Sequence, residues 1–199
     1  MIDGLNRVAR QEAVKMNNEL ITIRMAAEDD AEGILAIYAP YVTDTAITFE
    51  YDIPTIEDFA ERIKRTLMKY PYLVAILDKK IVGYAYASIF KDRAAYDWAV
   101  EMTVYVRQDC KAKGIGKNLY IALEEMLEKQ NIINLNACIA YPNPVSIGFH
   151  QDMGYKTVGH FTKCGYKFET WYDMVWMEKL IGKHPVPPNK VIPITQLKK

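Results

Sequence analysis

The sequence predicts an α/β fold with a mixed, mostly antiparallel twisted sheet that carries helices on both faces. Its 199 residues, half of them hydrophobic, suit one well-packed domain. Strand and helix patterns follow in the order strand, two helices, hairpin, strand, helix, strand, helix and two closing strands. Hairpins form antiparallel pairs and a helix between strands allows a crossover, so this order indicates a mixed sheet covered by helices.

The N-terminal region predicts an extension followed by a strand and a helix. Residues 1–20 mix apolar and charged side chains and are typical of an amphipathic helix appended before the core. Residues 20–25 alternate weakly like a strand, and the acidic run at residues 28–30 favours a helix start. We expect that helix to end at Pro40, because proline lacks a backbone donor and clashes with the preceding turn.

The remaining elements are separated by proline, glycine and charged turns. They are expected as a loop or short strand over residues 46–51, a helix from Pro54 to about Lys69, strands over 73–77, 81–90 and 98–106, a helix over 116–129, a strand over 135–140, a helix over 145–152, and strands over 155–162 and 170–178. We therefore predict an extension (1–20), a main domain (21–182) and an extended, proline-containing tail (183–199).

A basic turn with two glycines joins the strand that ends at Val106 to the helix that follows it. Gly114 and Gly116 let the backbone approach an anion, and the first amides of the helix lack intrahelical partners. Lys111, Lys113 and Lys117 add positive charge. The turn is either a phosphate-binding loop or a basic helix cap.

Glu101 lies in the middle of the strand 98–106, where a carboxylate needs an explanation. Alternation places it on one face with Thr103 and Tyr105. Burial would raise its pKa and suit a general base, whereas a salt bridge or a solvated edge would be a structural explanation. Both interpretations fit the strand position.

Composition narrows the class of protein. Lysines plus arginines equal aspartates plus glutamates at 25 each, which speaks against nucleic acid or an anionic membrane as a partner. The three cysteines are widely spaced and lack metal-ligand spacing, which favours a reducing compartment and no bound metal. Without a membrane span or a signal-peptide pattern, we expect a cytoplasmic protein.

Several ordered motifs resemble one known family. Val104-Tyr105-Val106, the Gly114 and Gly116 turn, Asn143 and Gly154-Tyr155 follow one another as in the GCN5-related N-acetyltransferase (GNAT) superfamily, whose third region has the form N-x-x-A-x-x-x-Y-x-x-x-G-F. The segments that look like phosphinothricin N-acetyltransferases within it are Tyr70-Pro71-Tyr72-Leu73-Val74-Ala75, Ala95-Tyr96-Asp97-Trp98, Gly165-Tyr166-Lys167 and Pro193-Ile194-Thr195-Gln196. The resemblance covers roughly residues 20–199.

The resemblance implies transfer of an acetyl group from acetyl-CoA to a primary amine, by direct attack without a covalent enzyme intermediate. The residues that it assigns to acetyl-CoA are Val104, Tyr105, Val106, Lys111, Ala112, Lys113, Gly114, Ile115, Gly116, Lys117 and Asn143. Lys111 stands where the superfamily usually has glutamine or arginine, which puts side-chain capping of the phosphate in doubt more than binding itself.

The resemblance also implies two catalytic residues. Glu101 matches the family's acidic base, acting directly or through a water. His150 occupies the position of the tyrosine that is usually proposed to protonate the departing thiolate, and a histidine can donate a proton near neutral pH. A packed core histidine on a short helix is the structural alternative.

The acceptor is expected to be a small amino-acid-like amine of the phosphinothricin, methionine sulfoximine or sulfone type. Lys91 and Arg93, together with Tyr96, suit a phosphinate, sulfone or carboxylate group, and a solvated charged loop is the structural alternative. By analogy Phe49 is expected at the acceptor, with Thr103 and Glu101.

Two other functions stay open: acetylation of a polyamine, aminoglycoside or protein, for which acidic residues would be needed at the acceptor site, and a non-catalytic acyl-CoA-binding protein. The family also suggests a homodimer joined through the C-terminal strands and tail.

Overall fold

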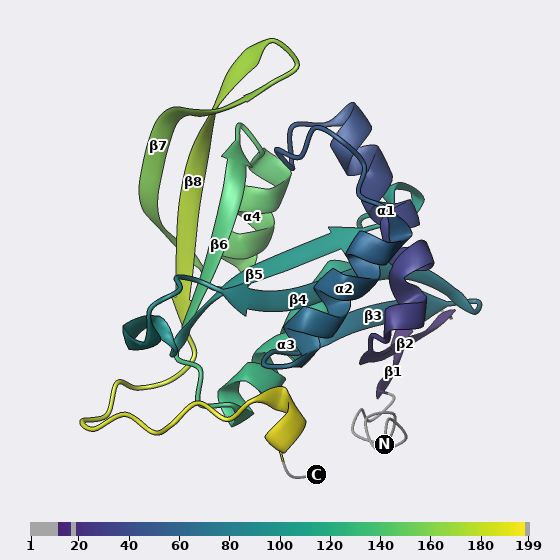
Figure 1. Ribbon diagram of the computed structural model, residues 1–199. Helices are drawn as coiled ribbons and strands as arrows, with labels where there is room; N and C mark the ends of the chain where they lie inside the picture. The colour runs from purple at the N-terminus through teal and green to yellow at the C-terminus, as the bar shows by residue number, and fades with distance from the viewer. Residues whose placement is uncertain (1–11, 17–18, 198–199) are drawn as a thin grey trace.

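The computed structural model describes residues 12–16 and 19–197, and it contains a single twisted sheet. In this part of the chain eight strands run in the order β1-β2-β3-β4-β5-β6-β8-β7, antiparallel throughout except for the parallel pair β5–β6 (Figure 1). The predicted fold class, a mixed and mostly antiparallel sheet with helices on both faces, is confirmed.

The strands are β1 (Glu12–Met16), β2 (Glu19–Met25), β3 (Tyr72–Leu77), β4 (Lys80–Ile89), β5 (Ala99–Val106), β6 (Asn134–Tyr141), β7 (Lys156–Lys167) and β8 (Thr170–Leu180). The α-helices are α1 (Ala31–Asp44), α2 (Ile56–Leu67), α3 (Ile115–Lys129) and α4 (Pro144–Asp152). One-turn 3-10 segments precede α1 at Glu28–Asp30 and end the tail at Ile194–Gln196.

The helix expected over residues 1–20 is wrong where the structure describes that region. Residues Glu12–Met16 form β1, paired antiparallel with β2. The local amphipathic pattern is overridden because backbone pairing with the neighbouring strand satisfies every second donor and acceptor of this segment. Residues 1–11 and 17–18 of the predicted extension lie outside the described residues.

The end of the first helix at Pro40 is also wrong, because α1 continues to Asp44 with Pro40 inside it. A proline within a helix costs about 3 kcal/mol in exposed host helices. Here the turn beyond it buries Tyr41 and Val42, at 5% and 1% exposure, and burial of each such side chain contributes roughly 1.5–3 kcal/mol. Packing therefore outweighs the local signal.

Local chemistry accounts for the other boundaries. Thr55 and Asp58 form a reciprocal capping box that starts α2. A two-residue turn with positive φ at Asp78 and Lys79 joins β3 to β4, as the hairpin pattern predicted. β7 extends to Lys167, five residues past its predicted end, because it pairs with β8 across two irregularities in register.

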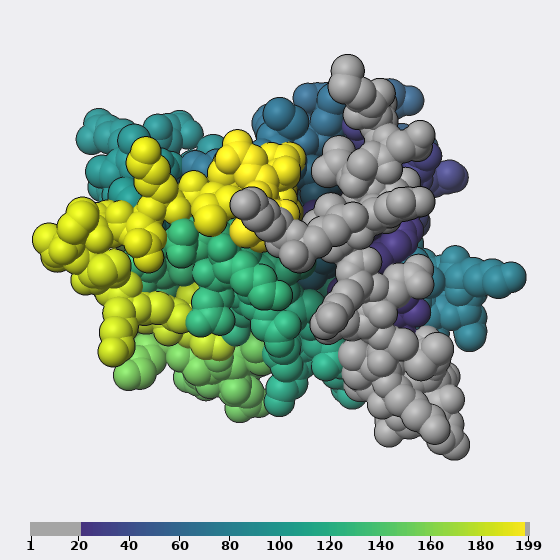
Figure 2. Space-filling view, turned by 90° about the horizontal axis from the view of Figure 1, so that it is seen from below, coloured from purple at the N-terminus to yellow at the C-terminus, as the bar shows by residue number. Residues whose placement is uncertain are grey.

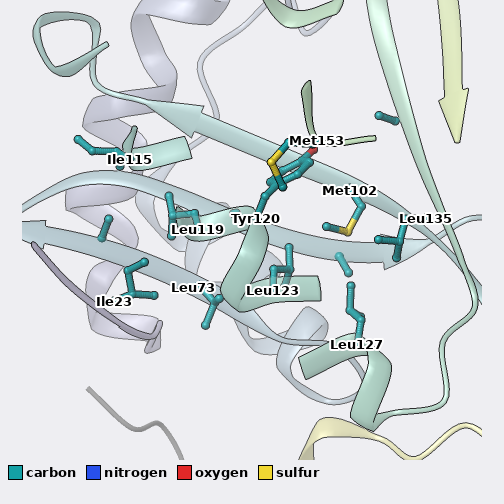
Figure 3. Close-up of a cluster of buried hydrophobic side chains, with 14 of the residues drawn as sticks. Ile23, Leu73, Met102, Ile115, Leu119, Tyr120, Leu123, Leu127, Leu135 and Met153 are labelled. Carbon is teal, nitrogen blue, oxygen red and sulfur yellow. The ribbon is translucent and has the colours of Figure 1, made fainter. Parts of the chain in front are cut away.

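Two apolar layers sandwich the sheet. On one face Leu119, Leu123 and Leu127 of α3 are fully buried against strand residues such as Leu73 and Leu135 (Figure 3). Four-residue spacing brings the three leucines to one side of the helix, which explains why this helix was predictable. On the opposite face α1 and α2 cover a second cluster, which includes Ile34, Phe59 and Tyr84.

The tail after β8 lies along the surface next to the end of α3 (Figure 2). Its backbone is held by Ile192, whose N–H donates to Gln130 O, and by Asn189 O, which accepts from the Trp98 indole N–H. The tail has no regular secondary structure between β8 and its closing 3-10 turn at Ile194–Gln196. Among the described residues, no helix is both long and apolar enough to cross a membrane.

Candidate active site

The parallel strands β5 and β6 separate after a short run of pairing. Pairing ends at Glu101 and Asn136, beyond which β5 stays bonded to β4 and β6 to β8 (Figure 1). Residues 102–105 and 137–140 consequently line the two sides of a cleft of about 310 Å³. Backbone groups at such an opened edge are available to an extended ligand that bonds as a neighbouring strand would.

Glu101 lies at the point where the two strands part. Its half-buried side chain lines the cleft, and burial raises the pKa of its carboxyl group, while the positive charge of Lys91 works against that rise. A carboxyl group with a raised pKa that faces a cleft suits a general base. Thr103, the next residue on the same strand face, lines the cleft as well.

The glycine turn has the geometry of an anion-binding loop. Gly114 adopts φ 71°, a left-handed conformation that glycine reaches at no steric cost, and α3 begins at the next residue. Asn118 N donates to Gly114 O as the first bond of the helix, so the amides of residues 115–117 lack intrahelical partners. A Cβ added at Gly116 would meet Val106 Cγ2 at 3.6 Å and no closer atom, so the first turn leaves room beside β5.

Asn143 and His150 lie at the two ends of α4, and both line the cleft. The Asn143 side chain accepts a hydrogen bond from Ser146 N and caps the helix. His150 is buried at 4% exposure, and its Nδ1 lies 2.8 Å from Ser146 O, which makes Nδ1 the donor. Its Nε2, 3.0 Å from the Tyr120 hydroxyl, is then the acceptor, and burial lowers the pKa of the ring.

A larger cavity of about 700 Å³ adjoins the cleft on the side of α2. The residues that line both spaces are Tyr38, Glu50, Tyr86 and Tyr105. Three cations of α2 and its following turn also line the larger cavity, namely Arg62, Arg65 and Lys69. Arg62 is held by Glu50 at 2.7 Å, and Lys69 by Asp97 at 2.8 Å.

The acceptor residues predicted from sequence are not all brought together. Lys91, Arg93 and Tyr96 are exposed and line neither the cleft nor the adjoining cavity; Tyr96 lines a separate cavity beside the tail. Lys91 is nevertheless close enough to Glu101 to affect its pKa. Phe49 is half-buried, its ring lies against Gly165 of β7, and it is not among the residues that line the cleft.

Sequence reasoning missed several residues that line these spaces. Tyr86 pairs with Thr103 across β4 and β5 and lines the cleft with it. The cations at positions 62, 65 and 69 recur at three- and four-residue steps, a helical-face signal that was available in the sequence. Glu50 and Tyr120 carried no such signal, because only the folded chain places them at the cleft.

The chain matches known proteins over most of its length. A profile of the acetyltransferase (GNAT) domain matches residues 23–176. A phosphinothricin N-acetyltransferase of Streptomyces viridochromogenes is 33% identical over 89% of this chain and 96% of its own. An L-methionine sulfoximine/L-methionine sulfone acetyltransferase of Pseudomonas paraeruginosa is 35% identical over 79% of this chain and 92% of its own. The crystal structure of a Sinorhizobium meliloti phosphinothricin acetyltransferase with acetyl-CoA superposes with a TM-score of 0.82, at 30% identity, over 90% of this chain and 99% of the other.

The chain therefore belongs to the GNAT acetyltransferase family. Within that family it is an acetyl-CoA-dependent N-acetyltransferase. The residues present fit acetyl-CoA, since the opened edge of β5 continues into a turn whose free amides and lysines suit a pyrophosphate. Within residues 12–16 and 19–197, no cluster of three or more metal-ligating side chains is found.

Proposed function

We propose that this enzyme acetylates the primary amine of a small amino-acid-like acceptor of the phosphinothricin, methionine sulfoximine or methionine sulfone type. The observation that carries the proposal is the tyrosine-walled cavity, which joins the cations of α2 to the cleft at Glu101. An amino acid has an amine and an anionic group separated by a few bonds, and this cavity offers a base at one end and cations at the other. The activities named for the relatives support the same class.

Glu101 is proposed as the general base. Its carboxylate takes a proton from the acceptor ammonium, directly or through a water, and frees the nitrogen lone pair for attack. Burial raises the pKa of the Glu101 carboxyl group, which makes its carboxylate a stronger base toward the acceptor ammonium. Bound acetyl-CoA supplies the activated thioester that the nitrogen attacks.

The proposed grip on acetyl-CoA has three parts. The backbone of residues 104–106 lines the opened edge, the turn 111–117 offers amides and lysines to the pyrophosphate, and Asn143 closes the far side of the cleft. Tyr41 supports this grip, because its hydroxyl donates to Val106 O at 2.7 Å and ties the end of β5 to α1.

The predicted role of His150 as a direct acid is revised in this proposal. A neutral ring whose N–H is bonded to Ser146 O has no proton to give from Nε2, and burial keeps the ring neutral at physiological pH. We propose that His150 acts through Tyr120, whose hydroxyl it orients at the cleft by the 3.0 Å hydrogen bond. His150 would then position a polar group beside the reacting atoms.

The anionic group of the acceptor is assigned to Arg65 and Lys69. Both line the larger cavity, whereas Lys91 and Arg93 do not. Arg65 is exposed and is assigned the direct contact with a carboxylate or phosphinate. Arg62 and Lys69 are already engaged by Glu50 and Asp97, so Lys69 adds its positive charge to the cavity while Arg65 binds the group. Lys91 retains a secondary role through its effect on the pKa of Glu101.

We also propose that the enzyme is a cytoplasmic homodimer. The β7–β8 hairpin exposes large apolar side chains, including Phe161, Phe168 and Trp171, each more than half exposed. A patch of this kind supports a homodimer formed through the C-terminal strands. Three free cysteines and dependence on acetyl-CoA support a cytoplasmic enzyme. Sedimentation velocity of wild type and Trp171→Lys tests the dimer.

The experiment that tests the proposed function is release of free thiol from acetyl-CoA across a panel of acceptors. Phosphinothricin, methionine sulfoximine and methionine sulfone should be acetylated. Polyamines, aminoglycosides and basic peptides are included in the panel as alternative acceptors. Turnover restricted to polyamines or peptides would overturn the acceptor class. Binding of acetyl-CoA without turnover of any amine would indicate a non-catalytic acyl-CoA-binding protein.

A further inference from the structure

Three consecutive residues near the tip of β7 hold the loop that follows α1. This β7 clasp consists of Gly165, Tyr166 and Lys167, and the loop is residues 48–51. Figure 1 shows the end of α1 and its following loop on the same side of the molecule as the β7–β8 hairpin. The contacts between these two distant parts of the chain bring the hairpin to the edge of the proposed acceptor site.

Each clasp residue makes a different kind of contact. The Phe49 ring lies against the backbone of Gly165, where an added Cβ would be only 2.4 Å from Phe49 Cζ. The Tyr51 hydroxyl donates to Tyr166 O. The Lys167 ammonium donates to Thr48 O at 2.9 Å and to Val42 O at 2.7 Å.

Lys167 is the unusual member, because it is a lysine at 2% exposure. Val42 O belongs to the last turn of α1, whose carbonyls have no intrahelical donor, so the ammonium caps the helix and the loop at once. The ammonium also lies 5.0 Å from the Phe168 ring, and its hydrogen-bond partners are carbonyl oxygens. Burial lowers the pKa of this lysine, and the negative charge of Glu50 opposes that change. A buried charge of this kind is expensive, and an apolar side chain of similar size would generally stabilise the fold as well or better.

Residues 48–51 connect Lys167 to the proposed acceptor site through a short series of hydrogen bonds. Thr48 Oγ1 lies 2.6 Å from the Tyr38 hydroxyl and accepts from Glu50 N at 3.3 Å. Glu50 in turn holds Arg62 of α2. Thr48, Tyr38 and Glu50 all line the cleft, so the carbonyl that Lys167 fixes belongs to a cleft-lining residue.

We propose that Lys167 is a positioning residue for acceptor recognition, which holds residues 48–51 so that Thr48 and Glu50 face the acceptor. The expected loss of acceptor turnover rests on the proposed function, whereas the expected loosening of residues 48–51 does not. The hydrogen-bond partners of Lys167 belong to α1 and the loop 48–51 rather than to the turn 111–117 or α4, so we expect its effect to fall on the acceptor more than on acetyl-CoA.

The test compares Lys167→Met with Lys156→Met, a matched loss of an exposed lysine on the same strand. The first readout is hydrogen exchange of the free protein, in which Lys167→Met should speed exchange of residues 47–51 relative to β4. The second is steady-state kinetics with an acceptor that the wild type acetylates. There kcat/KM for the acceptor should fall on the order of 10- to 100-fold, mainly through KM, while the KM for acetyl-CoA stays within about twofold.

Lys156→Met should match the wild type in both readouts. Unchanged exchange of residues 47–51 in Lys167→Met overturns the proposal, and so does an equal loss of affinity for acceptor and acetyl-CoA. If Lys167→Met does not fold, Tyr51→Phe, which removes one clasp hydrogen bond at an exposed residue, decides the question by the same readouts. If the wild type acetylates no amine of the panel, the proposed function fails, while the exchange comparison still decides whether Lys167 holds the loop.

Discussion

Replacing Gly165 with alanine tests whether the contact between β7 and the loop 48–51 shapes the acceptor site. An alanine Cβ would lie 2.4 Å from Phe49 Cζ and 2.6 Å from Cε2, whereas carbon atoms in contact prefer about 3.5–4.0 Å. The ring must therefore retreat by roughly 1 Å or more. The Phe49 ring also lies near Tyr172, at 6.2 Å between ring centroids, so its retreat changes this neighbouring contact as well.

The expected magnitude follows from this displacement. Overpacking of this kind lowers the free energy of unfolding by about 1–3 kcal/mol, and the half-exposed position of Phe49 favours the lower end of that range. For a chain of this size each kcal/mol lowers Tm by roughly 2–4 °C. A shift of about 1 Å in a substrate-positioning segment can cost on the order of 100-fold in rate, so we expect kcat/KM for the acceptor to fall on the order of 10- to 100-fold.

Thiol-release kinetics and thermal unfolding measure the two effects. Gly182→Ala serves as the control, because its Cβ would meet only an ordinary contact at 3.8 Å from Ile133. In a double-mutant cycle, Gly165→Ala should change Tm and acceptor kcat/KM little in the Phe49→Ala background, because the clash is then gone. Full acceptor kcat/KM in Gly165→Ala, or an undiminished cost in the Phe49→Ala background, would refute the reasoning.

Four further changes probe the remaining parts of the site. Glu101→Gln should lower kcat about 10²- to 10⁴-fold and remove the acidic limb of the pH–rate profile, and an unchanged rate at neutral pH would exclude Glu101 as the base. Lys91→Met removes the charge that lowers the pKa of Glu101, so that pKa should rise and the acidic limb should move to higher pH; a shift to lower pH would contradict the assigned sign. Gly116→Glu places a negative charge at the phosphate loop and should raise the Kd for acetyl-CoA about tenfold or more by calorimetry at unchanged Tm, whereas an unaltered Kd would sink the phosphate-loop assignment. His150→Phe should lower kcat and leave both limbs of the pH–rate profile in place, whereas loss of the alkaline limb would show that His150 is itself the acid.

Elements defined by local chemistry were predictable from sequence. The α3 helix follows from leucines at four-residue spacing, the start of α2 from a capping box, and the β3–β4 hairpin from a charged turn. The glycine turn was predictable for the same reason, since left-handed backbone at Gly114 and the free amides of a helix start are properties of a few adjacent residues.

Elements that depend on distant partners were not predictable. Pro40 lies inside α1 because buried side chains beyond it outweigh the local penalty, and Glu12–Met16 is a strand because β2 lies beside it. Donor chemistry in the sequence points to Lys91 and Arg93 for an anionic acceptor group, whereas the cations that line the cavity beside the cleft belong to α2 and the turn after it. The strand predicted over residues 155–162 ends before Lys167. The pairing of β7 with β8 shifts register twice, and these shifts hide the alternation of side chains that marks a strand.

The fold class, the glycine turn, the order of the GNAT motifs and the mid-strand position of Glu101 follow from the amino-acid sequence alone. Each of these can be recognised from short stretches of adjacent residues, because helix and strand periodicity fix the spacing within each stretch. The separation of β5 and β6 at Glu101, the cations that border the adjoining cavity and the contacts of Lys167 are visible only in the folded chain. Those features arise where segments far apart in the chain meet, and their energies come from burial and hydrogen bonds that no local pattern encodes.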